Sequence, residues 1–349
     1  MKVCVINPDL YRSSGVTVGI KRIHSTVLNY GVDNYFVICN DDFTKQDISW
    51  IPEGRLKIFN LMSLNPLILI KEIIRFSAWI DDSCFDVLHV HHRRLSLLLS
   101  LINYKKNIKV FYSANLTYGF NFLFWLLSPI NVIAVTMSVF KNVRSTTRSN
   151  NVKIIGNPTY FPCCVDSDVS INMNQAVCVA RLDSVKGHRN LIDAWSLLVK
   201  NGFLYRLIIV GEGDLEKDLR AQVNSLGLPE YIEFIGYSDN VLPFYLKSLF
   251  AILVSKVEGQ GIVTIEAAAA GRASLLTDVD GSRDCLPDNR SLPNGIKYGD
   301  VESLAEAIKY WFDHPDEVLL EGRKFFEFHK KINSFEAIGR KYFNAYKNL

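Results

Sequence analysis

The sequence of 349 residues lacks the features of a membrane-spanning or repetitive protein. Charged residues interrupt the apolar stretch at 64–80, and Ser128 and Pro129 break the one at 118–133. Neither stretch provides the roughly 18 uninterrupted apolar residues of a spanning helix. The net charge is only +3 and 48% of the residues are hydrophobic, which excludes a disordered chain. We therefore expect a folded protein without a transmembrane helix.

Cysteine chemistry is also sparse. The seven cysteines form no CxxC motif and no Cys/His spacing of the kind that zinc requires. Several lie in apolar strand-like runs, so we expect buried free thiols in a reducing cytoplasm rather than disulfides. The first residues, MKVCVI, already have the pattern of a strand, which predicts no signal peptide and a location inside the cell. The cysteines are at positions 4, 39, 84, 163, 164, 178 and 285.

Short β-branched apolar runs alternate with segments of helical periodicity along the whole chain. This pattern is typical of βαβ units with buried parallel strands, and the length exceeds that of one ordinary domain. We predict an α/β protein with two sheets. The expected strands are at 2–6, 35–39, 87–90, 108–113 and 132–135 in the first half, and at 176–180, 205–210, 232–235, 250–254 and 273–277 in the second.

The break between the two domains is expected near residues 156–174. There Gly-Asn-Pro, Phe-Pro-Cys-Cys and a polar stretch follow one another without periodicity. We predict an N-terminal domain over 1–160 and a C-terminal domain over 161–330. The last helix-like segment, in residues 331–349, is a candidate to cross back to the N-terminal domain.

The strongest functional signal is the run SKVEGQGIVTIEAAAAG at residues 255–271, directly after a strand-like run. In an open α/β sheet, ligands bind beyond the carboxyl ends of the strands. Gly259 and Gly261 permit a tight turn, and the following helix would present backbone N–H groups to a phosphate. Glu258 precedes this helix, and Glu266 lies on an otherwise small, apolar face. This pair favours recognition of sugar or ribose hydroxyls over simple stabilisation of the helix dipole.

A second signal is VARLDSVKGH, in which a predicted strand ends at Arg181 and Lys186 follows after a turn. Two cations at a strand end could clamp a diphosphate, with Arg as a bidentate donor and Lys as a point charge. Taken alone, a solvated basic turn explains them better. In the first half, Gly15 lies in a small-residue loop between the first strand and a helix. That loop is neither GxGxxG nor a Walker motif, although it could approach a phosphate.

The run HVHHRR lies at the end of the strand predicted at 87–90. Alternation along the strand places His89 and His91 on one face. Metal binding is one interpretation of this cluster. A role for His91, His92 or Arg93 on the side of an acceptor and a plain structural role are the other two, and both are favoured over a metal site.

These motifs resemble the retaining glycosyltransferases of the GT-B fold, specifically family 4 (glycosyl transferases group 1). The resemblance rests on RLDSVKGH, GEGDLEKDL, FIGY and EGQGIVTIEAAAAG, in the family's order across residues 175–310. The first half resembles the family more loosely, through the loop at Gly15 and the segments DVLHVHH and VFYSANL. The resemblance implies two Rossmann-like domains with parallel sheets that face each other across a cleft. It also implies that the C-terminal domain holds most of a nucleotide sugar.

The resemblance assigns roles to individual residues. Arg181 and Lys186 would bind the donor diphosphate and stabilise it as a leaving group. Glu258 would contact the sugar near the reacting carbon, and Glu266 the ribose hydroxyls. Further donor-binding positions would be Gly15, Gly236, Gly261 and Ile262.

The resemblance also bears on cofactors and on the sugar pocket. The family needs no metal, and no DxD-like carboxylate pair stands at a strand end here, so we expect no metal or other cofactor. The family often has His where this chain has Asn115, and Phe where it has Gln260. Both departures concern the pocket that receives the donor sugar.

Charge and aromatic residues suggest where the protein acts. Residues 1–170 carry 18 Lys/Arg against 12 Asp/Glu, whereas the remainder carries 21 against 24. An anionic partner or membrane surface is therefore favoured for the first half. The aromatic segment at 120–127 suits either a core helix or a surface that touches lipid.

We predict transfer of a hexose or N-acetylhexosamine from a nucleotide sugar, expected to be UDP-linked, to a lipid-linked glycan of bacterial surface polysaccharide. The expected location is the cytoplasm, at the inner face of the cytoplasmic membrane, without a nucleic-acid partner. Two alternatives stay open. One is a sugar-nucleotide epimerase on the same fold, and the other is a non-catalytic subunit that binds donor or glycan.

Overall fold

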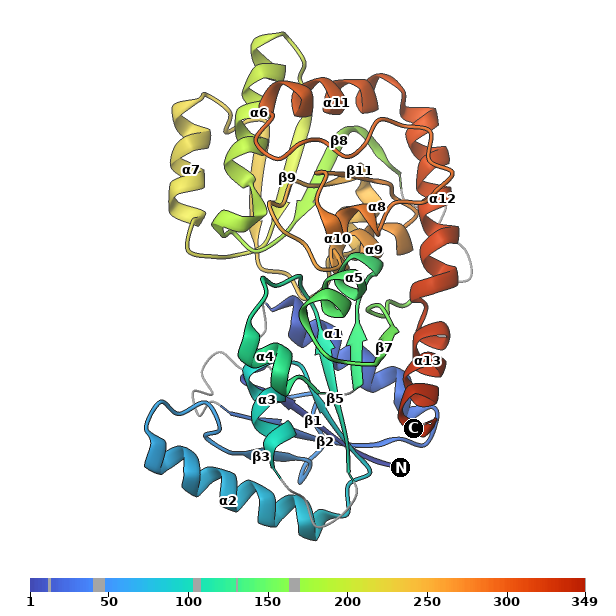
Figure 1. Ribbon diagram of the computed structural model, residues 1–349. Helices are drawn as coiled ribbons and strands as arrows, with labels where there is room; N and C mark the ends of the chain where they lie inside the picture. The colour runs from blue at the N-terminus through green and yellow to red at the C-terminus, as the bar shows by residue number, and fades with distance from the viewer. Residues whose placement is uncertain (12–13, 40–47, 103–107, 130, 163–169, 349) are drawn as a thin grey trace. The chain divides into compact units, whose positions relative to one another are not determined.

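The computed structural model describes residues 1–349 except 12–13, 40–47, 103–107, 130, 163–169 and 349. The chain divides into two compact units (Figure 1). The first contains Met1–Pro158 and Phe335–Leu349, and the second contains Thr159–Ser334. The last segment of the chain thus belongs to the same unit as its beginning.

The first unit is built on a seven-stranded parallel sheet in the order β3-β2-β1-β4-β5-β6-β7. All five strands predicted for this half are present. Two edge strands were missed, because they are short and largely exposed or half-buried and so have no apolar run to mark them. The strands are β1 (Lys2–Asn7), β2 (Asp33–Ile38), β3 (Leu56–Ile58), β4 (Val87–Val90), β5 (Lys109–Ala114), β6 (Asn131–Ala134) and β7 (Asn151–Ile154).

Apolar cores cover both faces of this sheet, because alternate strand residues point to opposite sides. Val3 and Val5 pack in the core that contains residues of α1 and α13, whereas Cys4 and Ile6 pack in the core that contains residues of α2 and α3. The α4 and α5 helices contribute to a third core on the same side as α2. The helices are α1 (Gly15–Leu28), α2 (Pro66–Ser83), α3 (Arg93–Leu101), α4 (Phe122–Leu127), α5 (Met137–Thr146) and α13 (Phe335–Lys347).

A buried histidine ties the returning helix α13 to the sheet. The ring of His89 lies between Ser113 Oγ, 2.7 Å from its Nε2, and Tyr346 Oη, 2.7 Å from its Nδ1. Burial lowers the pKa of His89 well below its ordinary value, with a smaller contribution from His91. The neutral ring can therefore accept one hydrogen bond and donate the other, which joins β4, β5 and α13.

The second unit contains a five-stranded parallel sheet in the order β10-β9-β8-β11-β12. All five strands predicted for this half are confirmed. They are β8 (Asn172–Val179), β9 (Arg206–Val210), β10 (Ile232–Gly236), β11 (Ser248–Leu253) and β12 (Ser274–Leu276). The helices are η1 (Ser184–Lys186), α6 (His188–Lys200), α7 (Glu216–Ser225), α8 (Leu242–Lys247), α9 (Ile262–Ala269), α10 (Asp280–Arg283), α11 (Val301–Asp313) and α12 (Pro315–Asn333).

Two expectations about burial need correction. Cys4, Cys39, Cys178 and Cys285 are buried thiols as predicted, but Cys84 is exposed because it ends α2. Cysteines 163 and 164 lie outside the described residues. In the aromatic segment 120–127, a core helix is the wrong interpretation for most positions, since within α4 only Phe124 is buried. None of the helices in the described ranges is long and apolar enough to traverse a bilayer.

The pH dependence of folding stability tests the burial of His24 in the first unit. Burial lowers the pKa of His24 to about 4, and its ring packs edge-on against Phe36 at 4.5 Å. Below about pH 6.5 the unfolded chain binds a proton that folded His24 excludes, so stability falls as the pH decreases. Between pH 7.5 and pH 5.0, the free energy of unfolding in urea should fall by about 2 kcal/mol less in His24→Phe than in the wild type. Equal losses would contradict a neutral, buried His24.

Candidate functional site

The strand order of the second unit locates its ligand-binding edge. The chain passes from β8 to β9 on one side of the sheet and later places β11 on the other side of β8. Neighbouring parallel strands whose connections run in opposite directions leave a crevice beyond their carboxyl ends. The predicted cations follow β8 and the predicted carboxylate follows β11. The topology therefore brings together the two motifs that are more than 70 residues apart in the chain.

On the β8 side, a short turn positions the two cations. The Asp183 carboxylate accepts hydrogen bonds from the backbone N–H groups of Val185 and Lys186, at 3.0 and 3.2 Å, and so caps η1. The same side chain forms an ion pair with Arg181, with Nη2 and Oδ2 2.9 Å apart. Asp183 thereby orders both the Lys186 backbone and the Arg181 guanidinium. Sequence reasoning missed it, although an Asp before a short helix is a typical capping signal.

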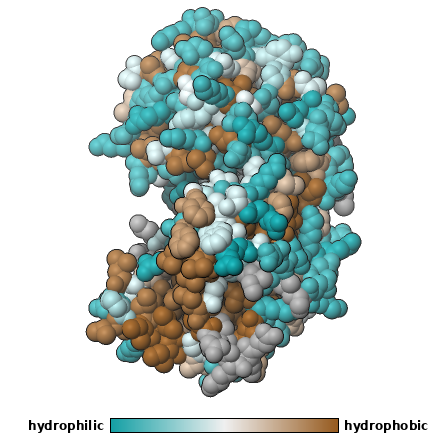
Figure 2. Space-filling model, viewed as in Figure 1, coloured by the Kyte–Doolittle hydropathy of each residue, from teal (hydrophilic) through white to brown (hydrophobic). Residues whose placement is uncertain are grey.

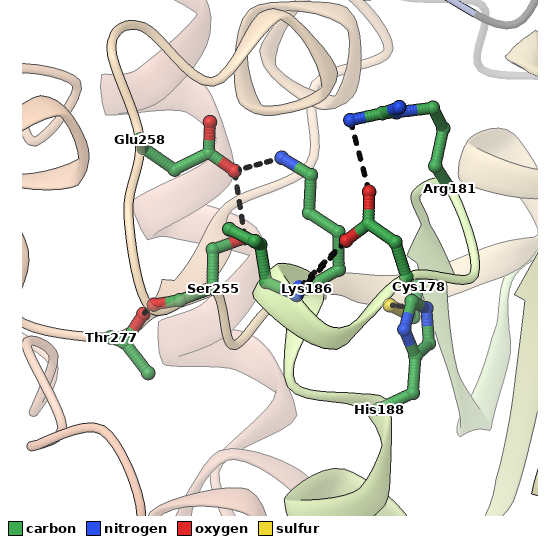
Figure 3. Close-up of polar contacts among 9 residues, drawn as sticks. Cys178, Arg181, Lys186, His188, Ser255, Glu258 and Thr277 are labelled. Atoms are coloured by element: carbon green, nitrogen blue, oxygen red, sulfur yellow. Dashed lines mark hydrogen bonds and ion pairs between the residues drawn. The ribbon is translucent and has the colours of Figure 1, made fainter. Parts of the chain in front are cut away.

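On the β11 side, Glu258 is only 7% exposed and lies in a network of hydrogen bonds. Ser255 Oγ donates to Glu258 Oε1 at 2.7 Å, and the Lys186 ammonium donates to the same oxygen. Thr277 Oγ1 donates to the Ser255 carbonyl at 2.6 Å and holds the loop from β12. Glu258 and Lys186 thus point toward one another from neighbouring strand ends (Figure 3). Nothing in the local pattern indicated Ser255 beyond its place after a predicted strand.

Two glycines let the loops of the site approach each other closely. Gly187 has φ +70°, and a Cβ at this position would lie 2.1 Å from the Val254 carbonyl oxygen. A Cβ at Gly281 would lie 2.4 Å from the carbonyl oxygens of Glu258 and Gly259. Neither position can hold a side chain unless the backbone moves. The two glycines therefore let neighbouring segments pack closely against the chain at Val254 and at Glu258–Gly259.

The helix α9 begins directly after this loop. Its N-cap, Gly261, has no side chain that could cap the first turn, and Ile262 is its first residue. A helix N-terminus presents backbone N–H groups and a positive dipole end, which favour an anion. Glu266 lies half-buried on the second turn. Gly261 and Ile262 thus lie at the start of α9 and Glu266 lies within it, directly after the loop that carries Glu258.

Charges at this edge suit an anionic ligand with hydroxyl groups. The side chains of Arg181 and Lys186 and the start of α9 supply positive potential, while Glu258 and Glu266 can accept hydrogen bonds. His188 lies beneath the turn, with its Nε2 3.8 Å from Cys178 Sγ. Burial lowers the pKa of His188 to about 4, so the ring is neutral near pH 7 and adds no charge.

The remaining donor position of the second unit lies further along the same edge. Gly236 ends β10, which is separated from β8 by β9. Its φ of +83° lies in the left-handed region that favours glycine. The structure therefore does not place Gly236 at the switch between β8 and β11. An open cavity of about 950 Å³ lies at the other end of β9 and β10, lined by Arg206 and Glu233 among others. It contains none of the predicted site residues.

The other predicted residues belong to the first unit. Its sheet has the same switch in strand order, between β1 and β4. Gly15 begins α1 after β1, and Asn115 follows β5. His91, His92 and Arg93 follow β4, so the structure brings these three to one strand end.

The side chains that follow β4 differ in character. Burial lowers the pKa of His91 to about 3, which excludes a cationic role near pH 7. Among the residues that the structure describes, His92 Nδ1 and Arg93 Nη2 are buried and find no hydrogen-bond partner. The Arg93 guanidinium lies 4.0 Å from the Phe124 ring centroid and 4.9 Å from that of Tyr118. In the described part of the chain, no three His, Cys, Asp or Glu side chains are grouped to hold a metal ion.

Comparisons with known proteins agree with this geometry. Residues 169–323 match the model of a family described as glycosyl transferases group 1, which confirms the resemblance predicted for the second half at the level of that group. A Campylobacter jejuni relative, "GalNAc-alpha-(1->4)-GalNAc-alpha-(1->3)-diNAcBac-PP-undecaprenol alpha-1,4-N-acetyl-D-galactosaminyltransferase", is 30% identical over 161 residues, 45% of this chain and 44% of its own. The amylovoran biosynthesis glycosyltransferase AmsD of Erwinia amylovora is 27% identical over 39% of this chain and 40% of its own. The matches thus span less than half the length of either relative.

Solved structures extend the likeness to the whole chain. The Anabaena protein Alr3699/HepE in complex with UDP has a TM-score of 0.82 at 15% identity, with 100% of both chains covered. At this identity the likeness concerns the fold. The predicted GT-B fold, with two Rossmann-like parallel-sheet domains, is confirmed.

A double-mutant cycle tests the buried ion pair. Replacement of Lys186 by Met leaves the Glu258 carboxylate buried with only Ser255 as its described neutral donor, which should destabilise the second unit by about 3 kcal/mol. The double variant Lys186→Met, Glu258→Gln should be less destabilised than the sum of the single variants, by about 1 kcal/mol or more. The free energy of unfolding in urea checks this. Strictly additive losses would show that the two side chains are not coupled.

Proposed function

On the premise that residues 169–323 form a glycosyl transferases group 1 domain, we propose that the protein is a retaining, family 4-like glycosyltransferase. It moves a hexose or N-acetylhexosamine from a nucleotide sugar, with UDP as the nucleotide. The observation that carries the proposal is the convergence of Arg181, Lys186 and Glu258 at the switch between β8 and β11.

The donor binds with its diphosphate at the β8 turn and the start of α9. Arg181 and Lys186 offset the charge of the diphosphate, and backbone N–H groups near Gly261 and Ile262 donate hydrogen bonds to it. Glu266 accepts hydrogen bonds from the ribose hydroxyls. Negative charge grows on the diphosphate as the bond to the sugar breaks, so these groups stabilise the transition state more than the bound substrate.

Glu258 faces the sugar in this proposal. Its carboxylate is fixed before the donor arrives, because Ser255 and Lys186 both donate to one oxygen, Oε1. A fixed acceptor orients sugar hydroxyls without a reorganisation cost during the reaction. Lys186 then lies between the carboxylate and the diphosphate and links sugar orientation to departure of the nucleotide. No metal takes part.

The first unit receives the acceptor, which we propose to be a lipid-linked glycan of bacterial surface polysaccharide. Two supports are the names of the relatives, one of which acts on an undecaprenol diphosphate glycan and the other in amylovoran biosynthesis. A third is charge, since the first unit carries 21 Lys/Arg against 11 Asp/Glu. His92 and Arg93 supply buried polar atoms without a hydrogen-bond partner among the described residues at the end of β4, and His91 lies at the same end. The protein works at the cytoplasmic face of the membrane.

Nucleotide release from UDP-, GDP- and ADP-sugars tests the proposal. With a UDP-sugar and a lipid-linked acceptor, Glu258→Gln and Arg181→Ala should each lower kcat/KM at least roughly tenfold, a loss of about 1.4 kcal/mol in transition-state stabilisation. Glu317→Ala, which removes an exposed carboxylate on α12, is the matched control and should keep wild-type activity.

The product distinguishes the proposal from its alternatives. Retention of the donor's anomeric configuration, read by NMR, is expected, and inversion would overturn the retaining assignment. Conversion of the donor sugar without any acceptor would indicate an epimerase. Donor binding by calorimetry without release under any acceptor would indicate a binding subunit.

A further inference from the structure

The helix α2 in the first unit is apolar on the side that faces solvent. Leu67, Ile70 and Ile74 follow one another at helical spacing and are 79%, 55% and 64% exposed. The opposite side of the helix buries Phe76 and Ile80 in the core beneath the sheet. A helix that only covers a sheet needs one apolar side. The outer apolar side of α2 therefore has no role in the core of this unit.

The short helix α4 repeats this feature on the same face of the sheet. Phe122, Leu123 and Leu126 are exposed, and so is Phe120 just before the helix. Only Phe124 is buried, against Tyr112 of β5. Apolar side chains gather over α2 and α4 in the space-filling view (Figure 2). We call these exposed side chains of α2 and α4 the apolar surface. These side chains project outward from two separate helices, an arrangement that suits insertion between lipid chains better than binding in a pocket.

Cations and an interfacial aromatic residue flank the apolar surface. Lys71 and Arg75 are exposed on α2, one helical turn apart and beside Ile74. Arg148 lies over the ring of Trp125 on α4, 5.1 Å from its centroid. Amphipathic aromatic rings and cations at the rim of an apolar face are typical of segments that lie in the headgroup region of a bilayer.

The charge of the two units points to the same partner. The first unit has 21 Lys/Arg and 11 Asp/Glu, a net charge of +10, whereas the second has 18 and 25, a net charge of −7. An anionic surface attracts the first unit and repels the second. Of the three acidic residues of α2, Glu72 is buried and paired with Arg75, whereas Asp81 and Asp82 lie in its last turns, beyond the apolar stripe. A second copy of the chain would bring +10 against +10, which disfavours self-association through this face.

We propose that α2 and α4 dock the first unit in the plane of an anionic membrane, with α2 as the main anchor. Leu67, Ile70 and Ile74 enter the acyl boundary, while Lys71 and Arg148 contact lipid headgroups. This rests on the proposed function in that the acceptor is lipid-linked, and it specifies the surface that brings the protein to it.

Flotation of the full-length chain with vesicles tests the docking surface. Wild type should float with vesicles of phosphatidylcholine and phosphatidylglycerol, and less with phosphatidylcholine alone. The triple variant Leu67→Asn, Ile70→Asn, Ile74→Asn should lose roughly tenfold or more in partitioning, because its apolar contribution to binding is removed. Leu204→Asn, Leu242→Asn, Leu320→Asn changes three exposed leucines of the second unit and is the matched control. It should float as the wild type does.

Two further measurements keep the outcomes separate. The single variant Lys71→Glu should weaken flotation with anionic vesicles only, and serves if the triple variant fails to fold. Calorimetric UDP binding should be unchanged in the α2 variants, because the proposed donor residues lie in the second unit, and also in the control, whose three leucines are not among those residues. A wild type that floats but does not bind UDP would count against the proposed function alone. The docking proposal is overturned if the wild type does not float, if the triple variant floats equally, or if α2 variants change only a dimerisation equilibrium.

Discussion

The buried pair of Lys186 and Glu258 is the interaction on which the functional edge of this protein depends. Each side chain follows a different strand, and the pair joins the β8 and β11 loops at the switch in strand order. Ser255 and Thr277 extend the same network to the loop after β12. Breaking one partner of a buried pair costs more than removing both, so the network resists change as a unit. Such rigidity is what a site that orients a sugar beside a leaving diphosphate requires.

The two units differ in net charge and in the side chains that they expose. The second unit is acidic as a whole, yet it concentrates Arg181, Lys186 and the start of α9 at one edge of its sheet, where an anionic donor would bind. The first unit is basic and carries an outward apolar stripe on α2. At its own strand switch it buries polar atoms of His92 and Arg93 that have no hydrogen-bond partner within the described ranges. We infer that donor recognition and membrane-bound acceptor recognition rest on separate parts of the chain.

Much of this could be predicted from the sequence, because parallel strands buried on both faces leave strong apolar signals. The strands of both sheets and the cation and carboxylate motifs follow from such local patterns. The short edge strands β3 and β7 do not, since they bury too little. The contact between Lys186 and Glu258, 72 residues apart, depends on strand order, which no local pattern specifies. Likewise the exposure of Leu67, Ile70 and Ile74 on α2 depends on which side of an all-round apolar helix meets the sheet.

Hydrogen–deuterium exchange with and without UDP tests the central claim, that the donor diphosphate binds at the switch between β8 and β11. Peptides that cover residues 181–188 and 258–266 should exchange more slowly on addition of UDP. Exchange at α2 and at the open cavity near Arg206 should not change. Protection confined to other parts of the second unit, or none at saturating UDP, would contradict it.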